Sequence, residues 1–348
     1  MRRALSFRLP ALRLIAIGLV VPLLIAGLTG CGDDEPDAST TPSTSANDSP
    51  SASPSDTEDG TEDGTGSGDA LPTVEGGFGE PPTVEVPDAD PPAELQVEVL
   101  SEGKGATVKS GQTVVVDYLG VRWEDGETFD SSFDSGRAPF GFATGAGGVI
   151  AGWDQGLVGQ KVGSRLLLVI PPDLAYGDTP PEGAPIQPGD TLVFVVDVLG
   201  VHTGSETASG EPTPTEDDSY PAVTVLPKKP EIFVPPGDAP PKLISIPVVT
   251  GKGKKVKSGD TVVVQYVGVL WRNGKQFDAS WDNGAPFVTQ IGVGAVIPGW
   301  DQGIVGKTVG SRVLLVIPSK LGYGEQGSGA IKPGDDLVFA VDILAAYN

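Results

Sequence analysis

The stretch "SGQTVVVDYLGVRWEDGETFDSSFDSGRAPF" at residues 110–140 returns as "SGDTVVVQYVGVLWRNGKQFDASWDNGAPF" at residues 258–287. Its run of valine and aromatic residues is typical of a buried β-strand. The Asp-Gly pair at 125–126 and the Asn-Gly pair at 273–274 each predict a tight hairpin turn directly after that strand. Because the whole segment is repeated, the chain has to be interpreted as an internal duplication.

The duplication continues on both sides of this segment. "VIAGWDQGLVG" at residues 149–159 answers "VIPGWDQGIVG" at 296–306, and "VGSRLLLVIP" and "LVFVVDVLGV" also have close counterparts. Two copies are too few for a solenoid, so each copy should own a hydrophobic core. We therefore predict a first domain at 71–202 and a second at 219–348, joined by a short acidic linker at 203–218.

Within each copy the pattern is mainly β. The apolar runs are bounded by proline and glycine, and no long stretch has a helical period. The best helix candidate is a segment of one or two turns starting at Trp153 or Trp300, with Asp154 or Asp301 in its first turn, where negative charge suits the helix dipole. A twisted antiparallel β-sheet packed on one short α-helix makes each domain α+β.

Composition excludes several functional classes. The formal charge of −23 over 348 residues argues against nucleic acid or an anionic membrane surface as an electrostatic partner. The single cysteine, Cys31, allows no intrachain disulfide. The single histidine, His202, leaves no His/Cys cluster for zinc and no plausible Ser-His or Cys-His pair. We expect no metal and no cofactor.

The first 31 residues have the layout of a secretory signal peptide, with four arginines before an apolar run. The run ends in "LTGC", which resembles a bacterial lipobox. That resemblance implies cleavage before Cys31 and acylation of this cysteine on sulfur and nitrogen, which would anchor the chain to the outer face of the cytoplasmic membrane. Removing four arginines and no acidic residue changes the charge from −23 to −27. The alternative is an ordinary signal peptide with an incidental cysteine.

An acidic stretch rich in Ser, Thr, Pro and Gly follows, over residues 32–70. It has almost no apolar residues to offset the entropy of ordering, so we predict a disordered tether. Its "DTEDGTEDG" lacks the ligand spacing and terminal glutamate of an EF-hand, which favours a solvated run of charge over a calcium site.

Six short motifs occur in order and in both copies. In the first copy they are "VDYLG", "FDSS", "APF", "GGVIAGW", "LAYG" and "DTLVF". Together they resemble the FKBP-type peptidyl-prolyl cis-trans isomerases. The resemblance implies two FKBP-like domains, each with a sheet wrapped around a short helix, and an apolar pocket between sheet and helix in which X-Pro amides are isomerised without a cofactor.

The resemblance also implies the site residues, position by position. In the first copy the catalytic candidates are Tyr118, Phe129, Asp130, Phe140, Val149, Ile150, Trp153, Tyr176 and Phe194, with Phe142 and Ile186 in substrate binding. In the second copy they are Tyr266, Phe277, Asp278, Phe287, Val296, Ile297, Trp300, Tyr323 and Phe339, with Ile331 in substrate binding. Thr289 stands where the first copy has Phe142, so the second pocket should be less aromatic on one wall.

The family resemblance gives some of these residues roles. It makes the Ile150 N–H and the Tyr176 hydroxyl the expected anchors for the substrate backbone, with Trp153 as the pocket floor. Asp130 either holds Tyr118 or accepts a contact near the twisting amide. Taken alone, an aromatic residue in a β-rich domain is usually ordinary core, although Trp153 between glycines is harder to explain by packing only, and Asp130 could be a strand-end cap.

The leading hypothesis is an envelope-anchored prolyl isomerase that assists the folding of exported proteins. Its expected partners are proline-containing unfolded or exported polypeptides, the membrane through Cys31, and macrolide inhibitors of the rapamycin class. The alternative is a non-catalytic chaperone or interaction module in which one or both pockets hold proline segments without isomerising them. An anchored adhesin or wall-structural repeat has no need of matched pocket residues and is the weakest reading.

Overall fold

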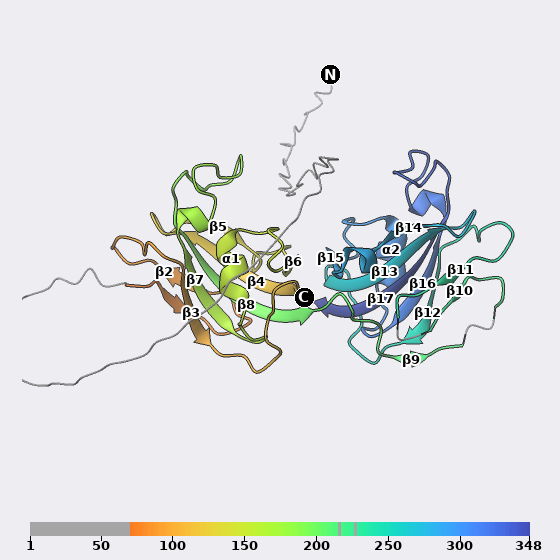
Figure 1. Ribbon diagram of the computed structural model, residues 1–348, viewed down its shortest axis with the longest axis horizontal. Helices are drawn as coiled ribbons and strands as arrows, with labels where there is room; N and C mark the ends of the chain where they lie inside the picture. The colour runs from red at the N-terminus through yellow and green to blue at the C-terminus, as the bar shows by residue number, and fades with distance from the viewer. Residues whose placement is uncertain (1–69, 215–216, 226–227) are drawn as a thin grey trace, which may run out of the picture. The chain divides into compact units, whose positions relative to one another are not determined.

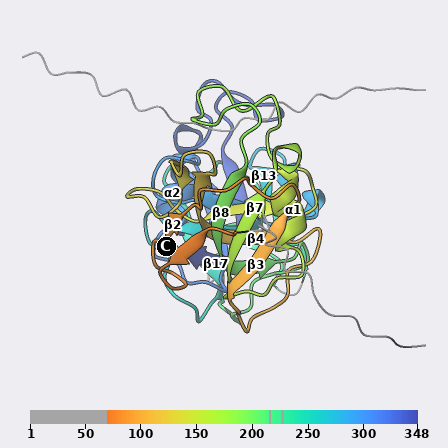
Figure 2. The same cartoon turned by 90° about the vertical axis from the view of Figure 1, so that its left-hand side faces the viewer.

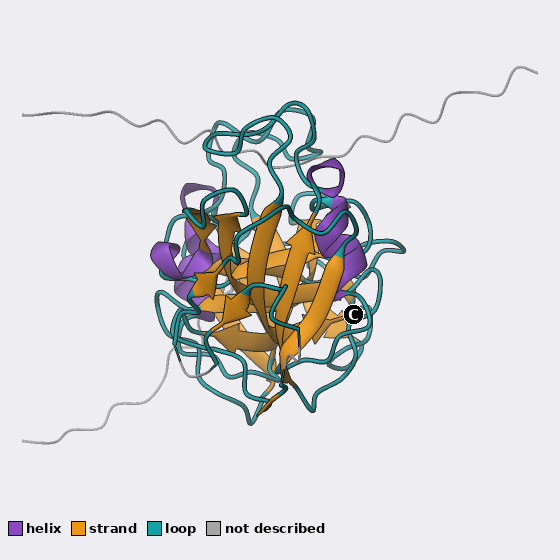
Figure 3. Cartoon of the chain, turned by 90° about the vertical axis from the view of Figure 1, so that its right-hand side faces the viewer, coloured by secondary structure: helices purple, strands orange, loops and turns teal. Residues whose placement is uncertain are grey.

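The computed structural model describes residues 70–214, 217–225 and 228–348. The predicted signal peptide with its lipobox and nearly all of the predicted tether, residues 32–70, lie outside these ranges. Strands dominate the described chain, and its helices are few and short (Figure 3). Within the same ranges no helix is long and apolar enough to cross a lipid bilayer.

The first domain contains a six-stranded antiparallel sheet (Figures 1 and 2). The strand order is β3-β7-β8-β4-β5, and β6 also pairs with β4. The strands and helices of this domain are β1 (Thr73–Glu75), β2 (Thr83–Glu85), β3 (Gln96–Ser101), β4 (Thr113–Arg122), β5 (Thr128–Ser131), β6 (Phe140–Ala143), α1 (Ala151–Leu157), β7 (Arg165–Ile170), the 3-10 helix η1 (Pro172–Leu174) and β8 (Leu192–His202).

The second domain repeats this sheet with one strand more. Its order is β14-β13-β17-β16-β12-β9, and β15 also pairs with β13. The elements are β9 (Glu211–Pro212), β10 (Ala222–Val223), β11 (Ile232–Phe233), β12 (Ile244–Thr250), β13 (Thr261–Leu270), β14 (Gln276–Ala279), η2 (Ser280–Asn283), β15 (Phe287–Gln290), α2 (Pro298–Ile304), β16 (Arg312–Ile317), η3 (Ser319–Leu321) and β17 (Leu337–Tyr347).

Each sheet buries side chains on both of its faces. All six residues of β7 are buried, and successive side chains of a strand point to opposite faces. Leu166, Leu168 and Ile170 belong to the core that contains Trp153, whereas Leu167 and Val169 belong to a second cluster. The unbroken apolar run "RLLLVI" is explained by this double burial.

The helix α1 lies close against the sheet. It has seven residues and begins at Ala151, two residues before the predicted start at Trp153. A Cβ atom added at Gly152 would come within 2.4 Å of Ile170, so a side chain at Gly152 would push the helix off β7. The predicted α+β class, with a short helix against an antiparallel sheet in each domain, is confirmed.

A short hairpin covers the other face of each sheet. Strands β1 and β2 pair with each other in the first domain, and β10 and β11 pair in the second. Val74 and Val84 pack against the cluster of Trp123, whose indole N–H donates to the carbonyl of Ala89 at 2.9 Å. These hairpins precede the repeated segments at 110–140 and 258–287. Their strands have only three or two residues, too few for a strand pattern to be recognised in the sequence.

A buried ion pair fixes the first hairpin. Arg165 donates through Nε and Nη2 to the Asp197 carboxylate at 2.7 and 2.8 Å, and both side chains are at most 2% exposed. The rest of the guanidinium donates to the carbonyls of Gly76 and Glu80, and Asp197 also accepts the N–H of Gly79 at 2.7 Å. The pair therefore ties the start of β7 to the hairpin that covers the sheet.

Part of the predicted linker, 203–218, lies against the second sheet. Its residues in β9 pair with β12. The Thr207 hydroxyl and the Ala208 N–H donate to Asp342 at 2.7 and 3.0 Å, and this carboxylate also forms a buried ion pair with Arg312. This pairing could not be expected from the segment itself, which is short, acidic and rich in turn-forming residues.

Candidate active site

Trp153 lies at the centre of a group of aromatic rings in the first domain. The first aromatic cluster comprises Tyr118, Phe129, Phe140, Phe142, Trp153 and Phe194. The Trp153 ring lies 5.1 Å from Phe194, 5.3 Å from Tyr118 and 5.4 Å from Phe142, measured between ring centroids. Trp153 is 4% exposed, whereas Phe140 at the edge of the cluster is 42% exposed. The cluster thus has a buried centre and an accessible apolar rim.

The sheet supplies most of these rings from neighbouring strands. Tyr118 lies on β4, which pairs with β5 at one end and with β6 at the other, and β8 lies on its opposite side. Gly120 allows the rings to meet: an added Cβ would lie 2.5 Å from the Phe129 ring and 3.0 Å from Phe194. A glycine inside a valine-rich strand indicates such a close approach, and both copies carry it in "YLG" or "YVG".

A polar group sits beside the first aromatic cluster. The Tyr118 hydroxyl donates to one carboxylate oxygen of Asp130, and Arg137 Nη2 donates to the other at 2.6 Å. Burial first, and then the bonded carboxylate, raise the pKa of the Tyr118 phenol well above its usual range. This contact is the one expected if Asp130 holds Tyr118, which is one of the two roles left open for it. Arg137 had no assigned role in the sequence.

The start of α1 presents a backbone donor beside the rings. Val149 and Ile150 are half-buried and pack against the core that contains Trp153. Among the described residues the Ile150 N–H makes no hydrogen bond, as an anchor for a substrate carbonyl requires. Asp154 accepts the N–H groups of Gly145 and Gly147 at 2.8 and 3.2 Å, which ties the loop before Val149 to the helix. The sequence suggested only a helix-dipole role for this aspartate.

The remaining candidates of the first domain come from the segment between β7 and β8. Tyr176 is half-buried, and no hydrogen bond from its hydroxyl occurs within the part of the chain that the structure describes. Burial, and then the nearby Asp130 charge, raise the pKa of this phenol. Ile186 is 7% exposed and is part of the same core as Trp153. Both therefore lie at the edge of the core that the first aromatic cluster occupies.

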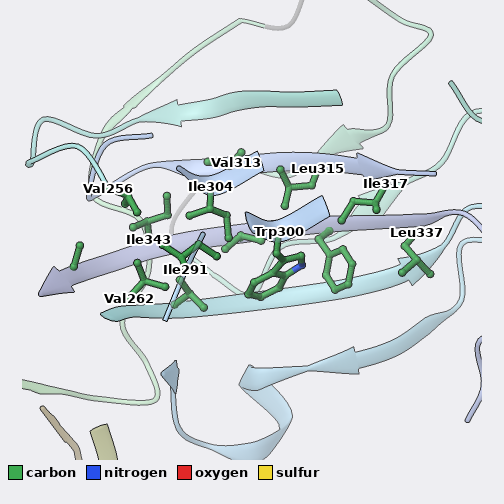
Figure 4. Close-up of a cluster of buried hydrophobic side chains, with 14 of the residues drawn as sticks. Val256, Val262, Ile291, Trp300, Ile304, Val313, Leu315, Ile317, Leu337 and Ile343 are labelled. Atoms are coloured by element: carbon green, nitrogen blue, oxygen red, sulfur yellow. The ribbon is translucent and has the colours of Figure 1, made fainter. Parts of the chain in front are cut away.

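The second domain repeats the arrangement. The second aromatic cluster comprises Tyr266, Phe277, Phe287, Trp300 and Phe339. Trp300 is 4% exposed and lies among aliphatic side chains that include Ile317 and Leu337 (Figure 4). Its ring is 5.2 Å from Tyr266, whose hydroxyl donates to Asp278.

The other second-copy candidates take corresponding places. Val296 and Ile297 pack against the core of Trp300, and Ile331 is buried in it. Within the described residues the Ile297 N–H is also free of hydrogen bonds. Phe287, the counterpart of Phe140, is 40% exposed, and Tyr323 is 38% exposed. A buried tryptophan with an accessible phenylalanine beside it is thus present twice.

The two sites differ at their edges. Phe142 stacks on Phe140 at 5.6 Å and touches Trp153, whereas the corresponding Thr289 turns its hydroxyl to the carbonyl of Gln290 at 3.2 Å. Arg137 has no counterpart, because "SGRAPF" in the first copy corresponds to "NGAPF" in the second. Both differences leave the buried tryptophan and its nearest rings in place.

Comparison with known proteins places both copies in one family. The family model described as FKBP-type peptidyl-prolyl cis-trans isomerase matches residues 104–199 and 252–344. An FK506-binding protein of Streptomyces anulatus is 49% identical over 122 residues, which are 35% of this chain and 98% of that protein.

Two mammalian relatives match about two thirds or more of the chain. The peptidyl-prolyl cis-trans isomerase FKBP9 of Rattus norvegicus is 31% identical over 265 residues, 76% of this chain and 40% of the relative. FKBP10 of Homo sapiens is 34% identical over 242 residues, 69% of this chain and 35% of the relative. The chain therefore spans well under half of these longer proteins.

Proposed function

The chain belongs to the FKBP-type peptidyl-prolyl cis-trans isomerase family, and we propose that it isomerises X-Pro bonds in exported polypeptides at a bacterial cell envelope. The observation that carries the site assignment is the accessible phenylalanine, Phe140 or Phe287, beside each buried tryptophan. In both domains the exposed ring continues a buried aromatic cluster, and a continuous apolar surface of this kind is typical of a ligand site. A pyrrolidine ring and the adjoining amide are the apolar and polar parts that such a surface accommodates.

The reaction requires rotation about a bond and no bond breaking. The planar X-Pro amide is held by resonance, and at the twisted transition state this resonance is lost and the carbonyl oxygen carries less negative charge. Water stabilises the planar form better than the twisted form. A surface of aromatic rings that removes water from the amide, with the Ile150 N–H holding a substrate carbonyl, therefore binds the transition state more tightly than the ground state.

The test uses the two rim phenylalanines in the full chain. We expect the F140A/F287A double variant to lower kcat/KM for a proline tetrapeptide about tenfold or more, since burying a phenylalanine contributes about 1.5–3 kcal/mol. Phe78→Ala is the matched control, because Phe78 is 41% exposed and lies outside both aromatic clusters. Unchanged isomerisation in the double variant would contradict the site assignment.

A second function has one observation in its favour. The second site lacks the phenylalanine that Thr289 replaces and has no counterpart of Arg137. A domain that only binds proline segments, without isomerising them, could lose both side chains. If Phe140→Ala alone abolishes isomerisation while the chain still binds an unfolded proline-containing client, the second domain is a binding module. If Phe287→Ala also lowers the rate, both domains are enzymes.

The proposed location rests on the N-terminal sequence. Acylation of Cys31 would attach the chain to the outer face of the cytoplasmic membrane, where exported polypeptides emerge unfolded. Labelling with a palmitate analogue in a bacterial host tests this: the label should enter the wild-type chain and not the Cys31→Ala variant. Equal labelling of both, or recovery of the wild type in the soluble fraction, would show that the segment is not a lipid anchor.

The proposed ligands follow from the same site. Unfolded polypeptides with accessible X-Pro bonds are the substrates, and a macrolide of the rapamycin class should compete with them for the aromatic clusters. Rapamycin should therefore inhibit the isomerisation and change the fluorescence of Trp153 and Trp300, which lie directly beneath the accessible rings. Full activity at saturating rapamycin would argue against this ligand class.

A further inference from the structure

The two sites differ in the charge around an equivalent carboxylate. In the first domain Asp130 is neutralised by Arg137 at 2.6 Å and also accepts the Tyr118 hydroxyl. In the second domain Asp278 accepts the Tyr266 hydroxyl, and no lysine or arginine of the described residues lies within 4.0 Å of it. The same Tyr-Asp pair is thus electrically compensated in one domain and carries a net negative charge in the other.

The difference originates in one turn. Gly136 and Gly284 occupy the same place after β5 and β14, and both have a positive φ, of 84° and 71°. The first copy continues with Arg137 before the Ala-Pro-Phe that leads into the rim phenylalanine, whereas the second copy continues directly. The second turn is therefore one residue shorter, and the missing residue is the cation.

Both carboxylates are within reach of a bound peptide. The Asp130 side chain is 39% exposed and Arg137 is 50% exposed, so solvent and ligand reach the pair. Asp278 is exposed, and Tyr266, which donates to it, packs on Trp300. A charged side chain next to the proline of a bound segment would pass this carboxylate at the edge of the aromatic cluster.

We propose that Arg137 determines the charge preference of the first site, and that its absence makes the second site favour proline segments with a basic neighbouring side chain. This inference rests on the proposed function, since it assumes that each aromatic cluster holds the proline. An uncompensated carboxylate attracts a lysine or arginine of the substrate, whereas the Asp130–Arg137 pair offers no net charge to it. Because the groups are exposed, the preference amounts to about two- to fivefold and weakens with salt.

The two sites are observed separately in the intact chain through their indole N–H signals in ¹H–¹⁵N NMR spectra. Signals of Trp153 and Trp300 are assigned with single Trp→Phe variants, and wild-type protein is then titrated with three peptides that carry Lys, Gln or Glu on both sides of one proline. We expect the ratio of Kd for the Glu peptide to Kd for the Lys peptide to be about two- to fivefold larger at Trp300 than at Trp153.

Reciprocal variants test whether Arg137 causes the difference in charge preference. Arg137→Gln should raise this ratio at Trp153 and leave it unchanged at Trp300, and an arginine inserted between Gly284 and Ala285 should lower it at Trp300. Lys161→Gln is the matched control, because it removes one exposed, ion-paired cation of the first domain at another place. In 0.5 M NaCl the difference between the two sites should largely disappear.

The outcomes separate the role of Arg137 from the proposed isomerase activity. Equal ratios at both sites, or equal shifts from Arg137→Gln and Lys161→Gln, would overturn the role of Arg137 and leave the isomerase assignment intact. Exchange spectroscopy on the same samples reports cis-trans interconversion of the bound proline. If neither indole signal responds to any peptide, and the cis-trans exchange of the peptide proline is not accelerated, the proposed function is refuted. If Arg137→Gln lowers the melting temperature, the insertion variant alone decides the question.

Discussion

Replacing Asp197 by asparagine should destabilise the first domain strongly. The carboxylate accepts three hydrogen bonds, two from Arg165 and one from the Gly79 N–H, and Asp197 is 0% exposed. Asparagine has one acceptor oxygen and no charge, so the Arg165 guanidinium remains buried without its counter-ion. Breaking a buried ion pair on one side costs about 3–5 kcal/mol. That is a large part of the total stability of about 5–15 kcal/mol expected for a domain.

The assay is urea-induced unfolding of the full chain, followed by tryptophan fluorescence and analysed by linear extrapolation. Lys161→Gln breaks an exposed ion pair in the same domain and should change the free energy of unfolding by less than about 1 kcal/mol. Hydrogen exchange should also accelerate at the β1–β2 hairpin, which the ion pair holds. If Asp197→Asn costs no more than Lys161→Gln, the buried pair does not anchor the hairpin and the reasoning is wrong.

Three further changes test the geometry of the sites. Gly152→Ala places a Cβ 2.4 Å from Ile170 and should cost about 1–3 kcal/mol of stability and lower kcat/KM, whereas Gly148→Ala, with no atom within 4 Å, should change neither. Thr289→Phe should strengthen peptide binding at the second site by about 0.5–1.5 kcal/mol, measured by calorimetry, because it restores an aromatic wall. The raised pKa of Tyr118 predicts stability that is fully present below about pH 10 and is lost as the pH rises through the folded-state value. Tyr118→Phe should reduce that alkaline loss in pH-dependent unfolding, and an unchanged profile would contradict the shift.

The sheets and the helix could be predicted because their signals are local. The valine runs of β4 and β13 are long, repeated and followed by Asn-Gly or Asp-Gly turns, so strand and hairpin needed no tertiary information. The helix was placed within two residues, because only one segment in each copy lacks strand character and has an acidic residue in its first turn. The six motifs, through the family that they resemble, then predicted which aromatic residues share a site.

The covering hairpins and the strand β9 could not be predicted, because their stability comes from distant residues. Strands of two or three residues interrupted by proline have no intrinsic preference strong enough to define them. They are held by Arg165, Asp197 and their second-domain counterparts, which lie about a hundred residues further along the chain. An arginine opening an apolar strand in both copies was the available signal, since a buried arginine requires a partner.

The two domains share the residues that build the fold and the centre of the site, and they differ in side chains beside it. The Arg-Asp anchor, the buried tryptophan, the Tyr-Asp pair and the glycine that lets the rings meet occur in both domains with nearly the same distances. Two of the differences lie beside the aromatic clusters: Phe142 is replaced by Thr289, and Arg137 has no counterpart. Because the tryptophan, the Tyr-Asp pair and the rim phenylalanine are present in both domains while groups beside them differ, we expect the two domains to share one isomerisation mechanism and to select different proline segments.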